Sequence, residues 1–147
     1  MAGPTKVLAT MSAHCEGGRA NGKVALSGDG GSTGRLYLHT EHAKGLGGSG
    51  EGTNPEQLFA MGYATCFNGA VLFVAAQKKL DAAKAKVTVE VDIGPNEAGG
   101  FALAARLKLH VPGLSTDQMR ELIEAAHMVC PYSNATRGNM PVELSVE

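Results

Sequence analysis

Three cysteines are the residues of this chain most able to do chemistry: Cys15, Cys66 and Cys130. Their number is odd, and the first 19 residues lack the continuous apolar stretch of a secretion signal. We therefore expect a cytoplasmic protein rather than a secreted disulfide scaffold. In a reducing cytoplasm a cysteine pair is more often catalytic, redox-sensing or metal-binding than structural.

Cys66 and Cys130 stand 64 positions apart, on two segments whose patterns predict helices. A single cysteine in a helix is ordinarily a small buried apolar residue. Cys130, however, precedes Pro131, where the chain must turn and a thiol can reach another element. If the two helices pack closely, their Cα atoms can come within the ~7 Å that a disulfide requires. This arrangement is typical of a peroxidatic and a resolving cysteine.

Two histidine-containing pairs have the spacing of zinc ligands. His39 and His42 are three residues apart, as are His127 and Cys130. The sequence places no second pair near either of them, and it contains no C-x-x-C motif. We therefore expect no metal site.

The glycine-rich stretch 45–50 matches the G-x-G-x-x-G pattern of dinucleotide-binding loops. That fingerprint also needs a parallel βαβ unit with an acidic residue about 20 positions further on. Residues 57–77 contain no acidic residue. We interpret the stretch as a loop and expect no bound cofactor.

Length and charge describe the protein that must position these thiols. The 147 residues predict a single domain, residues 1–147. Thirteen basic residues nearly balance 14 acidic ones, and no basic run interrupts the mixture. A nucleic-acid partner is therefore not expected.

The N-terminal part has the pattern of short strands, at residues 6–14, 23–27 and 35–40. Asp29-Gly30 is a hairpin signal, because both residues tolerate positive φ. An antiparallel meander is predicted. The glycine-rich loop 43–53 follows, and its role is left open.

Residues 57–77 carry no charge and are predicted to form a helix that starts at Asn54-Pro55. By length alone this helix could cross a membrane. Polar and glycine interruptions, such as Thr65, Asn68 and Gly69, instead favour a core helix, so no membrane partner is expected. A chain of 147 residues has little material left to surround about six helical turns. We therefore predict that another subunit covers part of this helix.

The C-terminal part combines strands with a second helix. Strands are predicted at 86–93 and 101–111, and a last strand at 142–146. Between them, Ser115 and Gln118 form a capping-box pattern that opens an amphipathic helix ending at Pro131.

Two long segments, GTNPEQLFAMGYATCF (52–67) and HMVCPYSNATRGN (127–139), closely resemble signatures of the Ohr (organic hydroperoxide resistance) branch of the OsmC/Ohr family. The resemblance runs over essentially the whole chain, including the GGR turn at 17–19 and the final strand. It implies an α+β fold in which antiparallel sheets surround two central helices of an intertwined homodimer.

The same resemblance implies a thiol-dependent peroxidase that reduces organic hydroperoxides to alcohols. Cys66 matches the peroxidatic cysteine and Cys130 the resolving one, so that an intramolecular disulfide forms. Arg19 matches the activating arginine and Glu56 the carboxylate that orients it. Dihydrolipoyl groups on lipoylated proteins would serve as the external dithiol reductant. Cys15 has no expected counterpart in the family.

Peroxide cleavage by sulfur requires the thiolate, and Cys66 lies too far into its helix for the helix dipole to stabilise it. A cation from elsewhere is needed, and Arg19 is the residue that the family supplies. Glu56 precedes Cys66 by ten positions, about 15 Å along a helix. We therefore infer that at least one of Arg19 and Glu56 comes from the partner subunit.

Apolar side chains at Met61, Phe67, Phe73 and Met128 favour organic hydroperoxides over hydrogen peroxide.

Two alternatives to this function remain. One is a peroxidase of the sister OsmC branch, and the other is a thiol redox sensor that does not turn over.

Overall fold

The structure is a computed structural model that describes residues 4–8, 10, 12–16, 19–21, 23–27 and 37–147. The chain divides into two compact units, Met1–Pro55 and Glu56–Glu147. Each unit has its own sheet. The prediction of a single domain, residues 1–147, stays a prediction.

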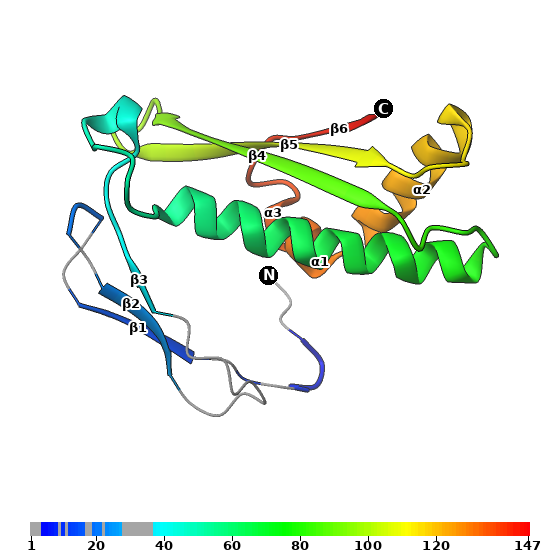
Figure 1. Ribbon diagram of the computed structural model, residues 1–147, viewed down its shortest axis with the longest axis horizontal. Helices are drawn as coiled ribbons and strands as arrows, with labels where there is room; N and C mark the ends of the chain where they lie inside the picture. The colour runs from blue at the N-terminus through cyan, green and yellow to red at the C-terminus, as the bar shows by residue number, and fades with distance from the viewer. Residues whose placement is uncertain (1–3, 9, 11, 17–18, 22, 28–36) are drawn as a thin grey trace. The chain divides into compact units, whose positions relative to one another are not determined.

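The N-terminal unit contains a three-stranded antiparallel sheet in the order β1-β2-β3 (Figure 1). Its strands are β1 (Ser12–Glu16), β2 (Lys23–Ser27) and β3 (Tyr37–His39). The predicted meander and the bounds of β2 are confirmed, but the first strand begins at Ser12 rather than at residue 6. In the stretch before β1 that was predicted to be part of the strand, Val7 and Leu8 are 66% and 88% exposed. The predicted hairpin turn at 28–32 lies outside the described residues.

The loop after β3 is closed by its own backbone. Glu41 N–H donates to the Thr53 carbonyl over 2.8 Å, and Thr53 N–H donates to the His39 carbonyl over 3.0 Å. A short 3-10 turn, Lys44–Leu46, lies inside the closed loop. Gly48 packs against His42 so tightly that an added Cβ would lie 1.7 Å from the His42 carbonyl oxygen. The glycine at position 48 therefore has a structural reason in the packing of the loop.

One carboxylate organises the second half of that loop. Glu41 accepts the Ser49 hydroxyl at 2.6 Å and three consecutive backbone N–H groups, at 3.1–3.2 Å. Those N–H groups belong to residues 50–52, directly before the segment that leads into the first helix. The Ser49 hydroxyl, followed by the Gly52 N–H, holds the pKa of Glu41 below its ordinary value.

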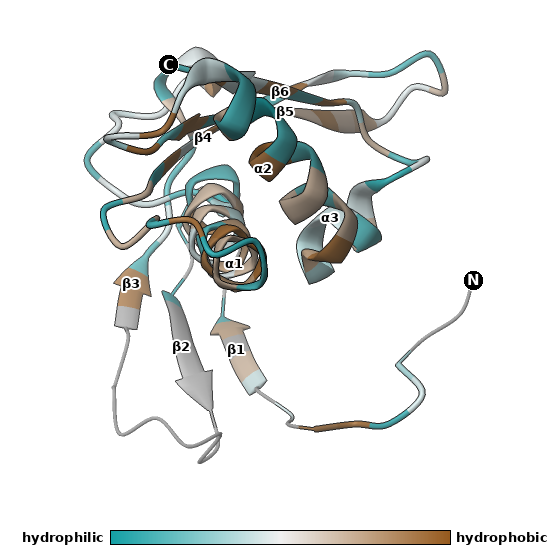
Figure 2. Ribbon diagram, turned by 90° about the vertical axis from the view of Figure 1, so that its right-hand side faces the viewer, coloured by the Kyte–Doolittle hydropathy of each residue, from teal (hydrophilic) through white to brown (hydrophobic). Residues whose placement is uncertain are grey.

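The C-terminal unit is an α+β structure in which a three-stranded sheet covers helices (Figure 1). The helices are α1 (Pro55–Gln77), α2 (Thr116–Val129) and the short α3 (Pro131–Thr136). The strands are β4 (Lys86–Pro95), β5 (Phe101–His110) and β6 (Val142–Val146). Seen end-on in Figure 2, α1 and α2 lie side by side beneath the sheet.

The strand order is β4-β5-β6, and the pairings differ in direction. β4 and β5 form an antiparallel hairpin that pairs Lys86 with His110 and Pro95 with Phe101. β6 joins β5 in parallel, from Ala105↔Val142 to Leu109↔Val146. This parallel pair differs from the expected purely antiparallel sheets. It arises because α2 and α3 form a crossover that returns the chain to the sheet in the same direction.

The core lies between the inner face of this sheet and the helices. Alternate residues of β5, such as Leu107 and Leu109, are fully buried, as the two-residue period of a strand requires. The opposite face is charged: Arg106 pairs with Glu90 and Asp92 on the neighbouring strand. The helices contribute further buried side chains, among them Tyr63, Phe67, Val71, Val74, Ala75, Met119, Leu122, Ile123 and Ala126.

α1 has one buried face and one exposed apolar face. By length and composition α1 could cross a membrane, and 33% of its most apolar window is buried within the chain. On its outer side Met61, Leu72 and Phe73 are 61%, 42% and 57% exposed. This uncharged outer face is the surface that the predicted second subunit would cover.

The second predicted helix is confirmed at its start. Ser115 accepts from the Gln118 N–H, and the Gln118 side chain accepts from the Ser115 N–H, so that both halves of the capping box are present. At its other end α2 stops at Val129, and the chain continues directly into α3, which the sequence analysis does not predict.

Candidate active site

The two helical cysteines come together in the C-terminal unit. The Sγ atom of Cys130 lies 3.6 Å from the Sγ atom of Cys66, and both thiols are free. Cys130 is fully buried, whereas Cys66 is partly accessible. The structure thus brings together the two residues that the sequence singled out as a reactive pair, with the accessible sulfur on α1.

Cys130 occupies the corner between two helices. It ends α2, where its N–H donates to the Ala126 carbonyl, and it is the N-cap of α3, where its carbonyl accepts from the Asn134 N–H. Pro131 is the first residue of α3, a position that needs no backbone donor. The corner forms because proline cannot continue α2 but can begin α3.

The surroundings of Cys66 act on its thiolate in opposite directions. Burial raises the pKa of the Cys66 thiol, and the neighbouring Cys130 sulfur raises it further. The backbone N–H of Tyr132, near the start of α3, acts as a donor to Cys66 and lowers the pKa. The net direction is upward. Within this unit alone, the thiolate therefore needs additional positive charge to form at neutral pH.

Glu56 and Arg19 belong to different units. Glu56 is buried, with 8% of its surface exposed, and it is the acidic residue in the first turn of α1, where the helix dipole favours negative charge. Arg19 is half-buried in the turn at residues 19–21 of the N-terminal unit. The roles of both residues beside Cys66 stay predictions.

Aromatic side chains form a cluster around the turn of α1 that precedes Cys66. The ring of Tyr63 lies 5.8 Å from Phe59, 5.7 Å from Tyr132 and 6.2 Å from Phe67, centroid to centroid. Phe67 is fully buried in the core, so it supports the site from beneath rather than lining an open surface. Of the other apolar residues predicted to favour organic substrates, Met128 is 62% exposed at the end of α2.

A buried polar network lies beside the sulfur pair. The Tyr63 hydroxyl is 2.9 Å from Ser133 Oγ and 3.3 Å from Thr136 Oγ1. Ser133 Oγ is also 2.9 Å from His127 Nδ1. Burial, followed by the nearby positive charge of Arg137, lowers the pKa of His127. His127, considered above with Cys130 as a zinc pair, thus uses one ring nitrogen for a hydrogen bond to Ser133.

Neither this network nor the role of the Tyr132 N–H is predicted from the sequence, because both depend on α3. One signal was available: Pro131 fits the first position of a helix as well as it fits the end of one, and Ser133 and Thr136 follow it. The polar residues of 133–136 could then have been placed on a helix that turns back toward α1.

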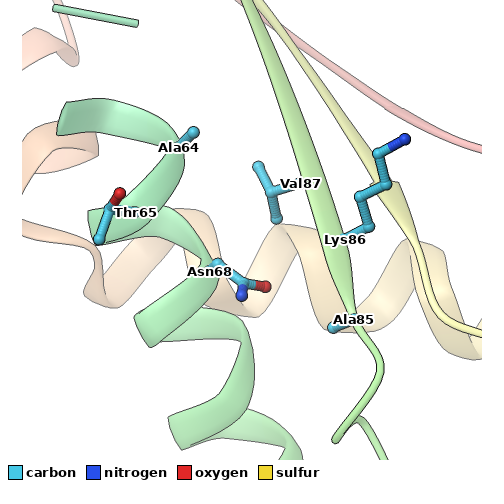
Figure 3. Close-up of a pocket in the computed structure, with 6 residues that line it drawn as sticks. All are labelled: Ala64, Thr65, Asn68, Ala85, Lys86 and Val87. Carbon is cyan, nitrogen blue, oxygen red and sulfur yellow. The ribbon is translucent and has the colours of Figure 1, made fainter. Parts of the chain in front are cut away.

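A shallow surface pocket of about 370 Å³ lies on another side of α1 (Figure 3). Thr65 and Asn68 line it from α1, and Lys86 from the start of β4. The Oδ1 atom of Asn68 is buried there, with no hydrogen-bond partner among the described residues. The sulfur pair is not part of its lining.

Outside this region, Cys15 is exposed on β1, and its thiol donates to the adjacent Glu16 carbonyl. In the part of the chain that the structure describes, no group of three or more His, Cys, Asp or Glu side chains is arranged to hold a metal ion.

The chain is similar to a known protein family and to proteins of known name. The family model described as OsmC-like protein matches residues 48–145, a range that contains both helical cysteines. The organic hydroperoxide resistance protein of Xanthomonas axonopodis pv. citri (strain 306) is 46% identical over 148 aligned positions, which cover 99% of this chain and 99% of that protein.

Solved structures give the same picture. An organic hydroperoxide resistance protein from Legionella pneumophila is similar with a TM-score of 0.86 and 44% identity, over 97% of this chain and 99% of that one. OhrB of Bacillus subtilis has a TM-score of 0.82 and 37% identity, over 96% of this chain and 100% of that one.

Proposed function

The chain belongs to the OsmC-like family and is most readily compared with its organic hydroperoxide resistance branch, and from this premise we propose that it is a thiol-dependent peroxidase that reduces organic hydroperoxides. The observation that carries the proposal is the 3.6 Å contact between a partly accessible sulfur on α1 and a buried sulfur at the α2–α3 corner. The names of the relatives support a role in peroxide resistance.

In the proposed first step, the thiolate of Cys66 attacks one oxygen of the hydroperoxide. The O–O bond breaks, the alkoxide leaves as an alcohol after taking up a proton, and Cys66 becomes a sulfenic acid. Arg19, oriented by Glu56, would offset the upward pKa shift of Cys66 and stabilise the leaving oxygen.

In the second step, the sulfur of Cys130 attacks the sulfenic sulfur of Cys66. The S–O bond breaks, the S–S bond forms, and the oxygen leaves as water with the proton of the Cys130 thiol. An external dithiol, for which we propose dihydrolipoyl groups on a lipoylated protein, then reduces the disulfide by thiol–disulfide exchange and is itself oxidised to a disulfide. This cycle needs no bound cofactor and fits a reducing compartment such as the cytoplasm.

We also propose that the active form is a homodimer in which the outer face of α1 is covered. Met61, Leu72 and Phe73 give this face an apolar character that a monomer would leave in water. Residues 57–77 carry no charge, so no ionised side chain of this segment opposes the burial of the face.

The test is stopped-flow kinetics of the reduced protein with an alkyl or fatty-acid hydroperoxide, followed by steady-state turnover with dihydrolipoamide. We expect kcat/KM for the organic hydroperoxides to exceed that for hydrogen peroxide. Cys66→Ser should abolish the first turnover, and Cys130→Ser should allow one turnover but block recycling by the dithiol. A single turnover without recycling in the wild-type protein would instead identify a redox sensor, and equal efficiency with hydrogen peroxide would contradict the substrate class.

A further inference from the structure

Each residue of the buried polar network that bonds to Ser133, and Ser133 itself, is three positions in sequence from one of the two cysteines. On α1, Tyr63 precedes Cys66 by three residues, so both side chains project from neighbouring positions on one face of the helix. At the corner, His127 precedes Cys130 by three residues and Ser133 follows it by three. Each hydrogen-bonding side chain is therefore about one helical turn away from a reactive sulfur.

Two hydrogen bonds in this network connect different pairs of helices. The 2.9 Å bond between His127 and Ser133 joins α2 to α3 across the corner that carries Cys130. The 2.9 Å bond between Tyr63 and Ser133 joins this corner to α1, the helix that carries Cys66. Tyr63 and Ser133 are both fully buried, so water cannot replace either partner without opening the core.

We propose that Tyr63, Ser133 and His127 form a positioning network that holds Cys130 within reach of Cys66 for disulfide formation. The inference rests on the proposed function for its biological setting, but the dithiol–disulfide equilibrium of the two cysteines can be measured without a hydroperoxide. None of the three side chains takes part in the chemistry. They act by fixing the separation and direction of the two sulfurs.

Disulfide formation demands such control, because the sulfurs must move from 3.6 Å to a bonded distance of about 2.05 Å with a defined dihedral angle. The reacting bond changes are those of the second step above: Cys130 sulfur displaces water from the Cys66 sulfenic acid. A misplacement of about 1 Å can slow a reaction between held groups by about a hundredfold. Meanwhile a second hydroperoxide can oxidise the sulfenic acid to a sulfinic acid, which is irreversible here.

The first measurement is the dithiol–disulfide equilibrium of the Cys66–Cys130 pair in dithiothreitol redox buffers, read by alkylation and mass spectrometry. The variants are Tyr63→Phe, Ser133→Ala and His127→Leu, each of which removes one hydrogen-bonding group. We expect each to shift this equilibrium toward the dithiol by about tenfold or more. His127→Asn keeps a polar group close to the position of Nδ1. Its dithiol–disulfide equilibrium should therefore lie close to that of the wild-type protein. Ser145→Ala is the matched control, because it removes another hydrogen-bonded serine hydroxyl on β6.

The second measurement separates the two chemical steps in time. After rapid mixing with one equivalent of cumene hydroperoxide, the rate of sulfenic acid formation should not fall in the three variants, because displacing the Cys130 sulfur removes a group that raises the pKa of Cys66. The rate of disulfide formation should fall, and sulfinic acid at Cys66 should appear at lower peroxide concentrations. A variant that is merely less stable would show a lower unfolding midpoint without this change in the partition between disulfide and sulfinic acid.

A wild-type equilibrium and wild-type resolution rate in the folded variants would overturn the proposal. His127 is half-exposed, so His127→Leu keeps the test available even if the two buried substitutions fail to fold. Failure of the proposed function has a different signature. In that case the wild-type protein would not turn over hydroperoxide, while the dithiothreitol equilibrium would still report whether the network positions the pair.

Discussion

The sulfur of Cys130 lies 3.6 Å from the sulfur of Cys66, a separation at which two thiols touch without sharing a bond. One sulfur is buried and the other is partly accessible. The two sulfurs therefore differ in accessibility. A molecule from solvent can approach Cys66, whereas Cys130 can be reached only from within the protein.

The first prediction concerns which cysteines become bonded. One equivalent of an organic hydroperoxide should produce a disulfide between Cys66 and Cys130 while Cys15 stays free, because the Cys130 sulfur already lies in contact with the Cys66 sulfur. Peptide mapping by mass spectrometry under non-reducing conditions measures this. Cys15→Ser should leave the turnover rate unchanged, and a mixed disulfide involving Cys15 as the main product would refute the assignment.

The second prediction concerns the pH dependence of Cys66. Because the Cys130 sulfur raises the pKa of the Cys66 thiol, Cys130→Ala should lower that pKa and increase the thiolate fraction at pH 7. Each unit of pKa corresponds to about a tenfold change in that fraction. Alkylation of Cys66 by monobromobimane, followed in a Cys15→Ser background, should be several-fold faster at pH 7. The alkylation rates of the two proteins should converge at high pH, where the Cys66 thiol is fully ionised in both. A slower rate for Cys130→Ala at pH 7 would contradict the prediction.

The third prediction tests whether each site is completed across a dimer. Arg19→Ala and Cys66→Ser should each be inactive or nearly so as single variants. If Arg19 reaches the Cys66 of its partner, equal co-expression of the two chains gives mixed dimers with one complete site, or about a quarter of wild-type activity. Separately purified homodimers, mixed without subunit exchange, are the control. No recovery in verified mixed dimers would place Arg19 and Cys66 in the same subunit.

The fourth prediction concerns stability at mildly acidic pH. Burial lowers the pKa of His127 in the folded protein, so the unfolded chain, with an ordinary histidine pKa of about 6.5, binds protons first as the pH falls. The free energy of unfolding should therefore decrease as the pH drops below about 6.5 toward the lowered value. Urea titrations at pH 7.5 and 5.5 measure the decrease. It should be smaller in His127→Asn, which has no titrating ring, and an equal decrease would exclude His127 as its source.

The fifth prediction concerns the loop after β3. Glu41→Ala removes the carboxylate that receives the Ser49 hydroxyl and three backbone N–H groups. Trypsin cleavage after Lys44, which is exposed in this loop, should become several-fold faster. Glu51→Ala is the matched control, because the Glu51 side chain takes no part in those four bonds. Equal cleavage rates in the two variants would show that Glu41 does not order the loop.

Most of the fold is readable from local patterns. The bounds of β2 and β6, the capping box at Ser115 and the start of α1 at Pro55 follow from strand alternation, cap chemistry and proline placement. The direction of β6 is not readable in this way. It depends on where the crossover through α2 and α3 returns the chain, which is a tertiary property.

The candidate site likewise has a part that the sequence predicts and a part that it does not. Cys66 and Cys130 are recognisable by residue type and position, and the structure brings them into contact. The Tyr63–Ser133 bond spans 70 positions and involves residue types that are common in any core, so no spacing rule indicates it. Short helices such as α3 also have too few residues to show a hydrophobic period.

The parallel pairing of β6 with β5 closes a long loop of the chain around the thiol corner. Residues 142–146 pair with 105–109, and the segment enclosed by this pairing contains both α2 and the corner at Cys130. A non-local pairing of this kind must overcome loop-closure entropy, which local helix formation does not. We therefore expect a folding intermediate in which α1 is formed but β6 is unpaired, and in which Cys130 has no fixed position beside Cys66.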